Sequence, residues 1–126
     1  METTLNILHH QTVDWLRELE FYVEELAILS GRLVEISDKW RSDKEVMRFS
    51  RHFQNRFISL REEVDALAKD IKFRETKIEK SAEKNPEEVD EQIRMADDKI
   101  FDRMAALAAG IGVSRYEFNR FLAKVM

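Results

Sequence analysis

The sequence predicts an all-α fold, an antiparallel up-down-up three-helix bundle of coiled-coil character. The 126 residues contain only three glycines and one proline, so architectures rich in strands and turns are not expected. Apolar residues recur at alternating steps of three and four along three stretches of nearly equal length, 1–40, 42–82 and 86–126. Because short turns between equal helices make antiparallel neighbours, we expect the whole chain, 1–126, to form one domain.

The first helix is expected over about residues 4–37. Its apolar stripe follows the a and d positions of a heptad repeat with one polar member, Thr12. Gly31 lies on the opposite row, where it weakens the helix without ending it. The stripe comprises Leu5, Leu8, Thr12, Trp15, Leu19, Tyr22, Leu26, Leu29, Leu33, Ile36 and Trp40.

The second helix is expected over about residues 43–80. Either Ser42 or Asp43 is a suitable N-cap, because a short side-chain oxygen can accept the free N–H groups of the first turn. The apolar stripe weakens after Ile71, so the helix end is expected to fray toward Lys80. The stripe comprises Val46, Ser50, Phe53, Phe57, Leu60, Val64, Leu67, Ile71, Arg74 and Ile78.

The third helix is expected to be interrupted or kinked near Gly110–Gly112. Asn85 followed by Pro86 marks its start, since proline suits the first helical position. The glycine pair should break a helix, and Ser114 with Glu117 has the spacing of a capping box. Since the apolar rhythm continues past the glycines, the sequence predicts two collinear pieces, helix 3 over about 86–109 and helix 4 over about 114–124.

The composition narrows the function classes. The chain has no cysteine, which excludes disulfides, thiolate metal sites and a cysteine nucleophile. The first residues have neither a basic nor an apolar run, so no secretory signal is expected, and no window is apolar enough to span a membrane. We therefore expect a cytoplasmic protein. The net charge of −4 gives no general reason to expect nucleic-acid binding.

The three histidines do not predict a metal site within one chain. His10 and Asp14 are four residues apart and could both point at one metal ion. In an antiparallel hairpin, however, His52 lies far from His9 and His10. No catalytic triad, Glu-x-x-His motif or phosphate-binding loop is present, so neither an enzyme nor a cofactor is expected.

Cations are concentrated around the first turn. Residues 39–61 hold seven of them against two acids, Asp43 and Glu45. Such a basic end could bind an anionic partner through Arg41, Lys44, Arg48 and Arg51. The reading favoured from the sequence is cross-helix pairing with the acids of the first helix, Glu24, Glu25 and Glu35.

The first helix carries a second apolar stripe outside the a and d rows. A second stripe requires a second neighbour, and Phe21, Ile28 and Val34 are the residues most expected to contact it. That neighbour could be another copy of the chain, a partner helix, or the chain's own 118–125 segment folded back. Scattered surface apolar residues are the remaining explanation.

Four segments together resemble a family of small, uncharacterised, predicted coiled-coil proteins of Bacteroidetes-type bacteria. They are His10 followed by Trp15-Leu-Arg-Glu-Leu-Glu-Phe-Tyr22, then Asp43-Lys-Glu-Val46, His52-Phe-Gln-Asn-Arg-Phe-Ile58 and Glu117-Phe-Asn-Arg-Phe-Leu-Ala-Lys124. The resemblance implies a bacterial cytoplasmic helical protein with a continuous third helix, from which the glycine pair departs. It implies no activity, cofactor or site residue.

The function expected from the sequence is a non-enzymatic protein–protein interaction or scaffolding module. We expect it to associate with itself as a homodimer through the first helix, or with a partner helical protein. The first alternative is binding of an anionic polymer or lipid surface by the basic end. The second is a metal-dependent enzyme with a site between subunits, built around His9, His10 and Asp14.

Overall fold

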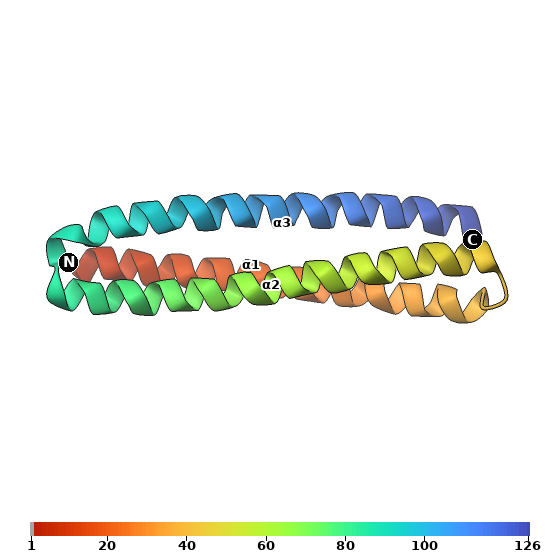
Figure 1. The fold of residues 1–126 in the computed structure, drawn as a ribbon, viewed down its shortest axis with the longest axis horizontal. Helices are drawn as coiled ribbons and strands as arrows, with labels where there is room; N and C mark the ends of the chain where they lie inside the picture. Colours follow the sequence, from red (N-terminus) through yellow and green to blue (C-terminus); the bar gives the residue numbers. More distant parts are fainter. Residues whose placement is uncertain (1) are drawn as a thin grey trace.

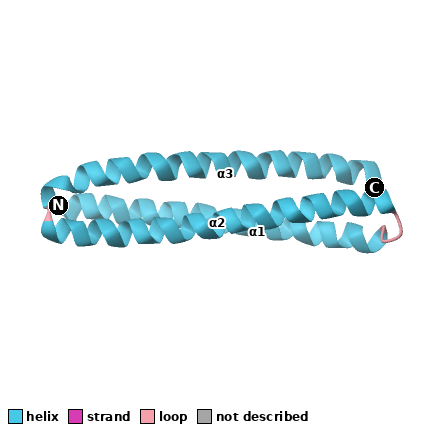
Figure 2. Cartoon of the chain, in the orientation of Figure 1, coloured by secondary structure: helices cyan, strands magenta, loops and turns pink. Residues whose placement is uncertain are grey.

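The structure, a computed structural model, describes residues 2–126, with side chains described from Leu5 onward. Three long helices run up, down and up beside one another, and the two chain ends lie at opposite ends of the rod (Figure 1). No strand occurs within the described residues (Figure 2). The all-α three-helix bundle predicted from the sequence is confirmed. The elements are α1 (Glu2–Lys39), α2 (Lys44–Lys84), a short 3-10 turn η1 (Pro86–Glu88) and α3 (Val89–Val125).

Asp43 is the residue that starts α2. Its side-chain carboxylate accepts hydrogen bonds from the backbone N–H groups of Glu45 at 3.0 Å and Val46 at 3.1 Å. These are two of the donors that have no partner inside the first turn of a helix. Of the two candidate caps in the sequence, the structure therefore uses Asp43 rather than Ser42.

The end of α2 does not fray at Lys80 but continues to Lys84. Ile78 and Ala82 are buried there in a small apolar cluster with Leu8 and Val89. This packing stabilises the last turns although the heptad pattern is weak. After Asn85, the expected proline-led start is a 3-10 turn, and the regular helix begins at Val89.

The helix α3 is continuous across Gly110 and Gly112, so the separate helix expected over 114–124 is the end of α3. A Cβ added at Gly110 would lie 3.3 Å from the Cδ2 atom of Leu60, so the glycine allows α3 to approach α2 closely. Leu107 and Ile111 are buried on either side of it. Burial of these side chains outweighs the poor helix propensity of the glycines, which depends on local sequence alone.

Ser114 does not cap a helix. It is fully buried in the middle of α3, and its hydroxyl oxygen accepts a hydrogen bond of 2.9 Å from the Nε–H of Arg56 on α2. The capping-box interpretation of Ser114 and Glu117 is therefore wrong. The sequence has the residue spacing of a capping box, but the Ser114 hydroxyl instead forms a hydrogen bond between α2 and α3.

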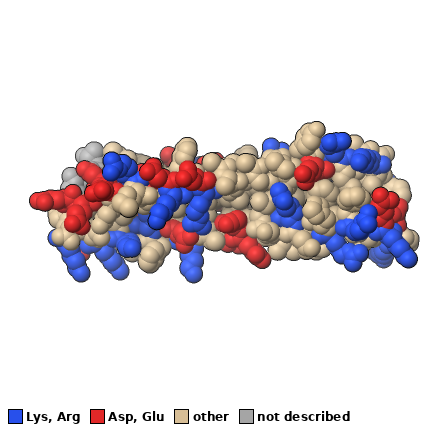
Figure 3. Space-filling model, turned by 45° about the horizontal axis from the view of Figure 1, so that its top comes forward, with Lys and Arg blue, Asp and Glu red and all other residues tan. Residues whose placement is uncertain are grey.

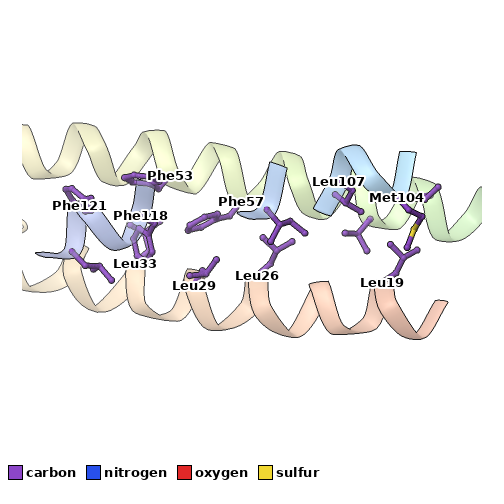
Figure 4. Packing of buried hydrophobic residues seen from close by; sticks show 14 of the residues in the cluster. Leu19, Leu26, Leu29, Leu33, Phe53, Phe57, Met104, Leu107, Phe118 and Phe121 are labelled. Atoms are coloured by element: carbon purple, nitrogen blue, oxygen red, sulfur yellow. The ribbon is translucent and has the colours of Figure 1, made fainter. Parts of the chain in front are cut away.

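Aromatic side chains fill the core near the α1–α2 turn. Phe53 and Phe57 of α2 meet Phe118 and Phe121 of α3, and Leu29 and Leu33 of α1 complete the layer (Figure 4). The ring centroids of Phe118 lie 5.2 Å from Phe53 and 5.4 Å from Phe57, both in edge-to-face arrangements. Aromatic pairs at such distances add stability beyond their buried area.

The three helices do not contact one another equally. The central helix α2 packs extensively against both α1 and α3, whereas α1 and α3 touch each other much less. The α1–α3 interface is therefore the least extensive of the three.

Replacing Gly31 with alanine should stabilise the protein by about 1 kcal/mol, the usual difference between glycine and alanine inside an exposed helix. The new Cβ would meet no atom within 4 Å. Denaturant unfolding followed by circular dichroism measures the change. Gly110→Ala is the matched comparison and should gain less, since its Cβ would press on Leu60; equal gains at both positions would contradict the close packing of α3 on α2.

Candidate interaction surfaces

The apolar residues predicted on the outside of the first helix are exposed in the structure. Phe21 and Ile28 are each 66% exposed, and Ile7 is 61% exposed. These three residues repeat at multiples of seven, so they lie along one row of α1. The same row also holds Asp14 and Glu35, but large apolar side chains exposed at three of its positions make it a candidate contact surface.

Val34 does not share this row. It is also exposed, but it lines a groove of about 480 Å³ between α1 and α2, together with Ile58 and Arg51. The step of six residues from Ile28 to Val34 turns the side chain well away from the first row. The structure therefore divides the predicted stripe between two surfaces, Phe21 and Ile28 on one and Val34 on the other.

The predicted basic end lies beside the α1–α2 turn. Lys44, Arg48 and Arg51 follow one another at steps of four and three, which places them on one side of α2. Figure 3 shows cations gathered at this end of the rod, and further cations at the other end, where they are mixed with acids. Arg48 also lies 5.6 Å from the ring of Phe49.

The cross-helix pairing favoured from the sequence does not account for these cations. Among residues 5–126, Lys44, Arg48 and Arg51 make no ion pair, and Arg41 makes only a long one, 3.4 Å, to Asp38 in the same turn. Glu25, one of the acids expected to neutralise them, instead accepts a hydrogen bond from Arg115 of α3. The positive charge of the basic end is therefore free to meet an external anion.

The histidines lie apart, as the sequence predicts. The Nδ1 atom of His9 lies 2.8 Å from a carboxylate oxygen of Glu75 on α2, whereas His10 and Asp14 are exposed on α1. His52 lies near the other end, with its ring against Phe53. No cluster of three His, Asp or Glu side chains able to hold a metal ion occurs in the part of the chain that the structure describes.

A buried polar layer crosses the bundle near the end that holds the α2–α3 turn. Arg74 of α2 is only 6% exposed, and its guanidinium donates to Asp97 of α3 and, at 2.9 Å, to Gln11 of α1. The same group lies 4.8 Å from the ring centre of Trp15. Burial disfavours the charged form and lowers the pKa of Arg74, while Asp97 opposes that change.

One arginine thus joins all three helices. Two of its nitrogen atoms, Nε and Nη1, have no hydrogen-bond partner among residues 5–126. A groove of about 440 Å³ between α2 and α3 passes beside it, with Phe73 and Met95 exposed at its sides and Lys77 and Lys99 among its lining. Sequence reasoning placed Arg74 on the apolar stripe but did not recognise its role, although a charged residue in a heptad core position is the signal for such a layer.

Tyr22 is the other perturbed group. It donates a hydrogen bond of 2.6 Å to Glu18, one turn earlier on α1. Burial, together with this acceptor, raises the pKa of Tyr22 to about 12. The neutral phenol therefore acts as a hydrogen-bond donor that orients the exposed carboxylate of Glu18.

Comparison of the chain with protein-family models, with characterised proteins and with solved structures found no match. The resemblance to predicted coiled-coil proteins therefore stays a prediction. Within residues 2–126, no helix is both long enough and apolar enough to cross a membrane.

Removing Asp97 should destabilise the protein by about 3 kcal/mol, because it leaves the buried charge of Arg74 without its partner. The lower end of the usual range is expected, since the Asp97 side chain is 29% exposed and water can replace it in part. Chemical unfolding of Asp97→Ala measures this loss. The double variant Arg74→Met with Asp97→Ala should regain most of it; a double variant as unstable as the single one would show that the charge is not the cause.

Proposed function

We propose that this protein is a non-enzymatic interaction module that associates with a second copy of itself through the outer face of α1. The observation that carries the proposal is the exposure of Phe21 and Ile28, each 66%, on one row of a helix whose opposite row forms the core. Covering two such side chains removes enough apolar surface from water to favour association. The expected setting is cytoplasmic, in line with the prediction from the sequence.

The architecture supports an interaction role rather than a chemical one. The helices form an elongated rod (Figure 1), and exposed apolar side chains lie along its sides. Flanks of this kind suit contact with another helix, which can follow the same row along several turns. A homodimer needs only one such surface, because the two copies present the same residues to each other.

The test is the solution molar mass of the double variant Phe21→Asp with Ile28→Asp, measured by light scattering at low and high salt. The native chain should have the mass of a dimer at both salts, since apolar contact is not weakened by screening. The double variant should have the mass of a monomer. A native chain that is monomeric at both salts would contradict self-association.

Phe73→Asp is the matched control, because Phe73 of α2 is as exposed as Phe21 but lies on another surface. It should leave the mass of the dimer unchanged. Circular dichroism must show that all variants stay helical. If Phe73→Asp dissociated the dimer as well as the α1 variant does, the contact would not be specific to α1.

A second candidate is binding of an anionic polymer by the basic end, favoured by the absence of ion pairs at Lys44, Arg48 and Arg51 within residues 5–126. The three side chains share one side of α2, and Arg41 lies in the turn before it. A row of unpaired cations attracts phosphate groups, and such binding depends on the release of counterions.

For this candidate, Arg48→Glu with Arg51→Glu should abolish binding of inorganic polyphosphate, and the affinity of the native chain should fall steeply as salt is raised. Fluorescence anisotropy with a labelled polyphosphate measures both. The matched control is Lys77→Glu with Lys99→Glu, which removes the same charge from the other end of the rod. An equal loss of polyphosphate affinity in both double variants, or an affinity that does not depend on salt concentration, would rule out a specific site at the basic end.

A further inference from the structure

We infer that the second copy is seated on the outer face of α3, antiparallel to it, with the two-fold axis close to Ala108. This inference rests on the proposed self-association, and it identifies α3 as the helix at the centre of the dimer interface. Two aromatic side chains on α3 are exposed, Phe101 by 67% and Tyr116 by 64%, and both lie on the side of the helix that faces away from the core. Both aromatic side chains are mostly exposed, although the guanidinium of Arg120 lies 5.9 Å from the centre of the Tyr116 ring.

A row of small, uncharged residues connects these two aromatic rings. Ala105, Ala108 and Gly112 follow Phe101 at steps of four and three, so all lie on one side of the helix with Tyr116. Residues 104–114 contain no Asp, Glu, Lys or Arg in a chain that is 37% charged. In Figure 3, which brings the top of the rod toward the viewer, the upper part of the surface is free of charged side chains at mid-length, while acids lie below this area.

The charges on either side of this band are of opposite sign. Residues 87–103 hold seven acids against three bases, and residues 115–126 hold three bases against one acid, Glu117. A parallel copy would bring acidic half to acidic half, which is unfavourable. An antiparallel copy brings each acidic half to a basic half. Asp97, Arg103 and Arg115 already pair within the chain. The net charge of the remaining residues still changes sign along the helix, so it is complementary to itself in the antiparallel direction, as a two-fold symmetric dimer requires.

The positions of individual residues along α3 are consistent with a two-fold axis near Ala108. Phe101 and Tyr116 lie almost equally far from it, and so do Asp98 and Arg120, which point to the same flank of the row. Neither Asp98 nor Arg120 makes an ion pair within residues 5–126. Each Asp98 would therefore meet the Arg120 of the other copy. At the axis itself, alanine and glycine let two helices approach closely.

The exposed row of α1 borders this surface. Arg115 of α3 donates to Glu25 of α1, which fixes the two helices at the same level. Phe21 and Ile28 lie about one turn before and after Glu25. Since α1 and α3 run in the same direction, Phe21 lies level with the uncharged band of α3, and Ile28 lies just beyond it, near the level of Tyr116. One partner can therefore cover both surfaces.

The chain's lack of cysteine gives a direct test, because a single introduced cysteine can react only with its copy. Under mild oxidation, Ala108→Cys should form a disulfide-linked dimer, since the two sulfur atoms would meet at the axis. Ala66→Cys, on an exposed position of α2, is the matched control and should stay unlinked. Linking of Ala66→Cys to the same extent would overturn the inference.

Charge reversal tests the direction of the partner. Asp98→Arg and Arg120→Asp should each raise the Kd of the dimer about tenfold, because two contacts per dimer become repulsive. The double variant restores opposite charges and should return to within about threefold of the native Kd. Sedimentation equilibrium measures all three. A double variant as weak as the two single changes combined would overturn the antiparallel arrangement.

The results separate the two proposals. If the native chain is a dimer that Phe21→Asp with Ile28→Asp dissociates, while Ala108→Cys does not link and charge reversal has no effect, only the seat on α3 is overturned. If the native chain is a monomer, self-association itself fails. If Ala108→Cys forms a disulfide-linked dimer and the double charge reversal restores the native Kd, the second copy and its antiparallel direction are both established.

Discussion

The fold depends on a fixed register between three helices whose apolar rows are nearly uniform. A row of leucine, isoleucine and valine at heptad spacing packs almost as well after a shift of one heptad. Apolar burial alone therefore does not fix the axial register of one helix relative to another. Two features at different levels along the rod remove this freedom. Near the α1–α2 turn, phenylalanine rings of α2 and α3 interlock at fixed angles. Toward the other end, Arg74 requires Gln11, Trp15 and Asp97 at one level.

The two features differ in their chemistry. The phenylalanine cluster stabilises the native register by burial and by ring contacts. The arginine layer acts mainly against alternatives, because any shift would leave a buried guanidinium without its carboxylate. Polar groups inside helical bundles are known to specify register in this way. Since α2 lies between α1 and α3 and carries Arg74, the level of both outer helices is set from the central one.

Much of the fold could be predicted from the sequence. The a and d rows, the turn before α2 and the three-helix architecture followed from heptad spacing and from a few capping residues, all of which are local signals. The continuity of α3 was not predictable in the same way, because glycine propensity is a local property while the close approach of α3 to Leu60 is a tertiary one. Ser114 shows the same limit: a capping-box spacing does not reveal that an arginine on another helix will use the hydroxyl.

The candidate surfaces were predictable to a lesser degree. Heptad position alone indicated that Phe21 and Ile28 would be outside, and both are exposed. The six-residue step from Ile28 places Val34 on another row, but only the structure shows that this second row lines a groove between α1 and α2. The outer row of α3 could not be recognised from the sequence, because it contains alanines, and alanine occurs both in cores and on surfaces. Only the packing of α3 on α2 determined which of them remain outside.

An odd number of antiparallel helices has a mechanical consequence. The residues at the two termini of the described chain lie at opposite ends of the rod (Figure 1). With 37 residues in α3, each helix spans about 55 Å at ~1.5 Å per residue. A four-helix bundle would bring the two ends of the chain together, whereas here they are separated by the length of the rod. An antiparallel pair would present one terminus of each kind at both of its ends.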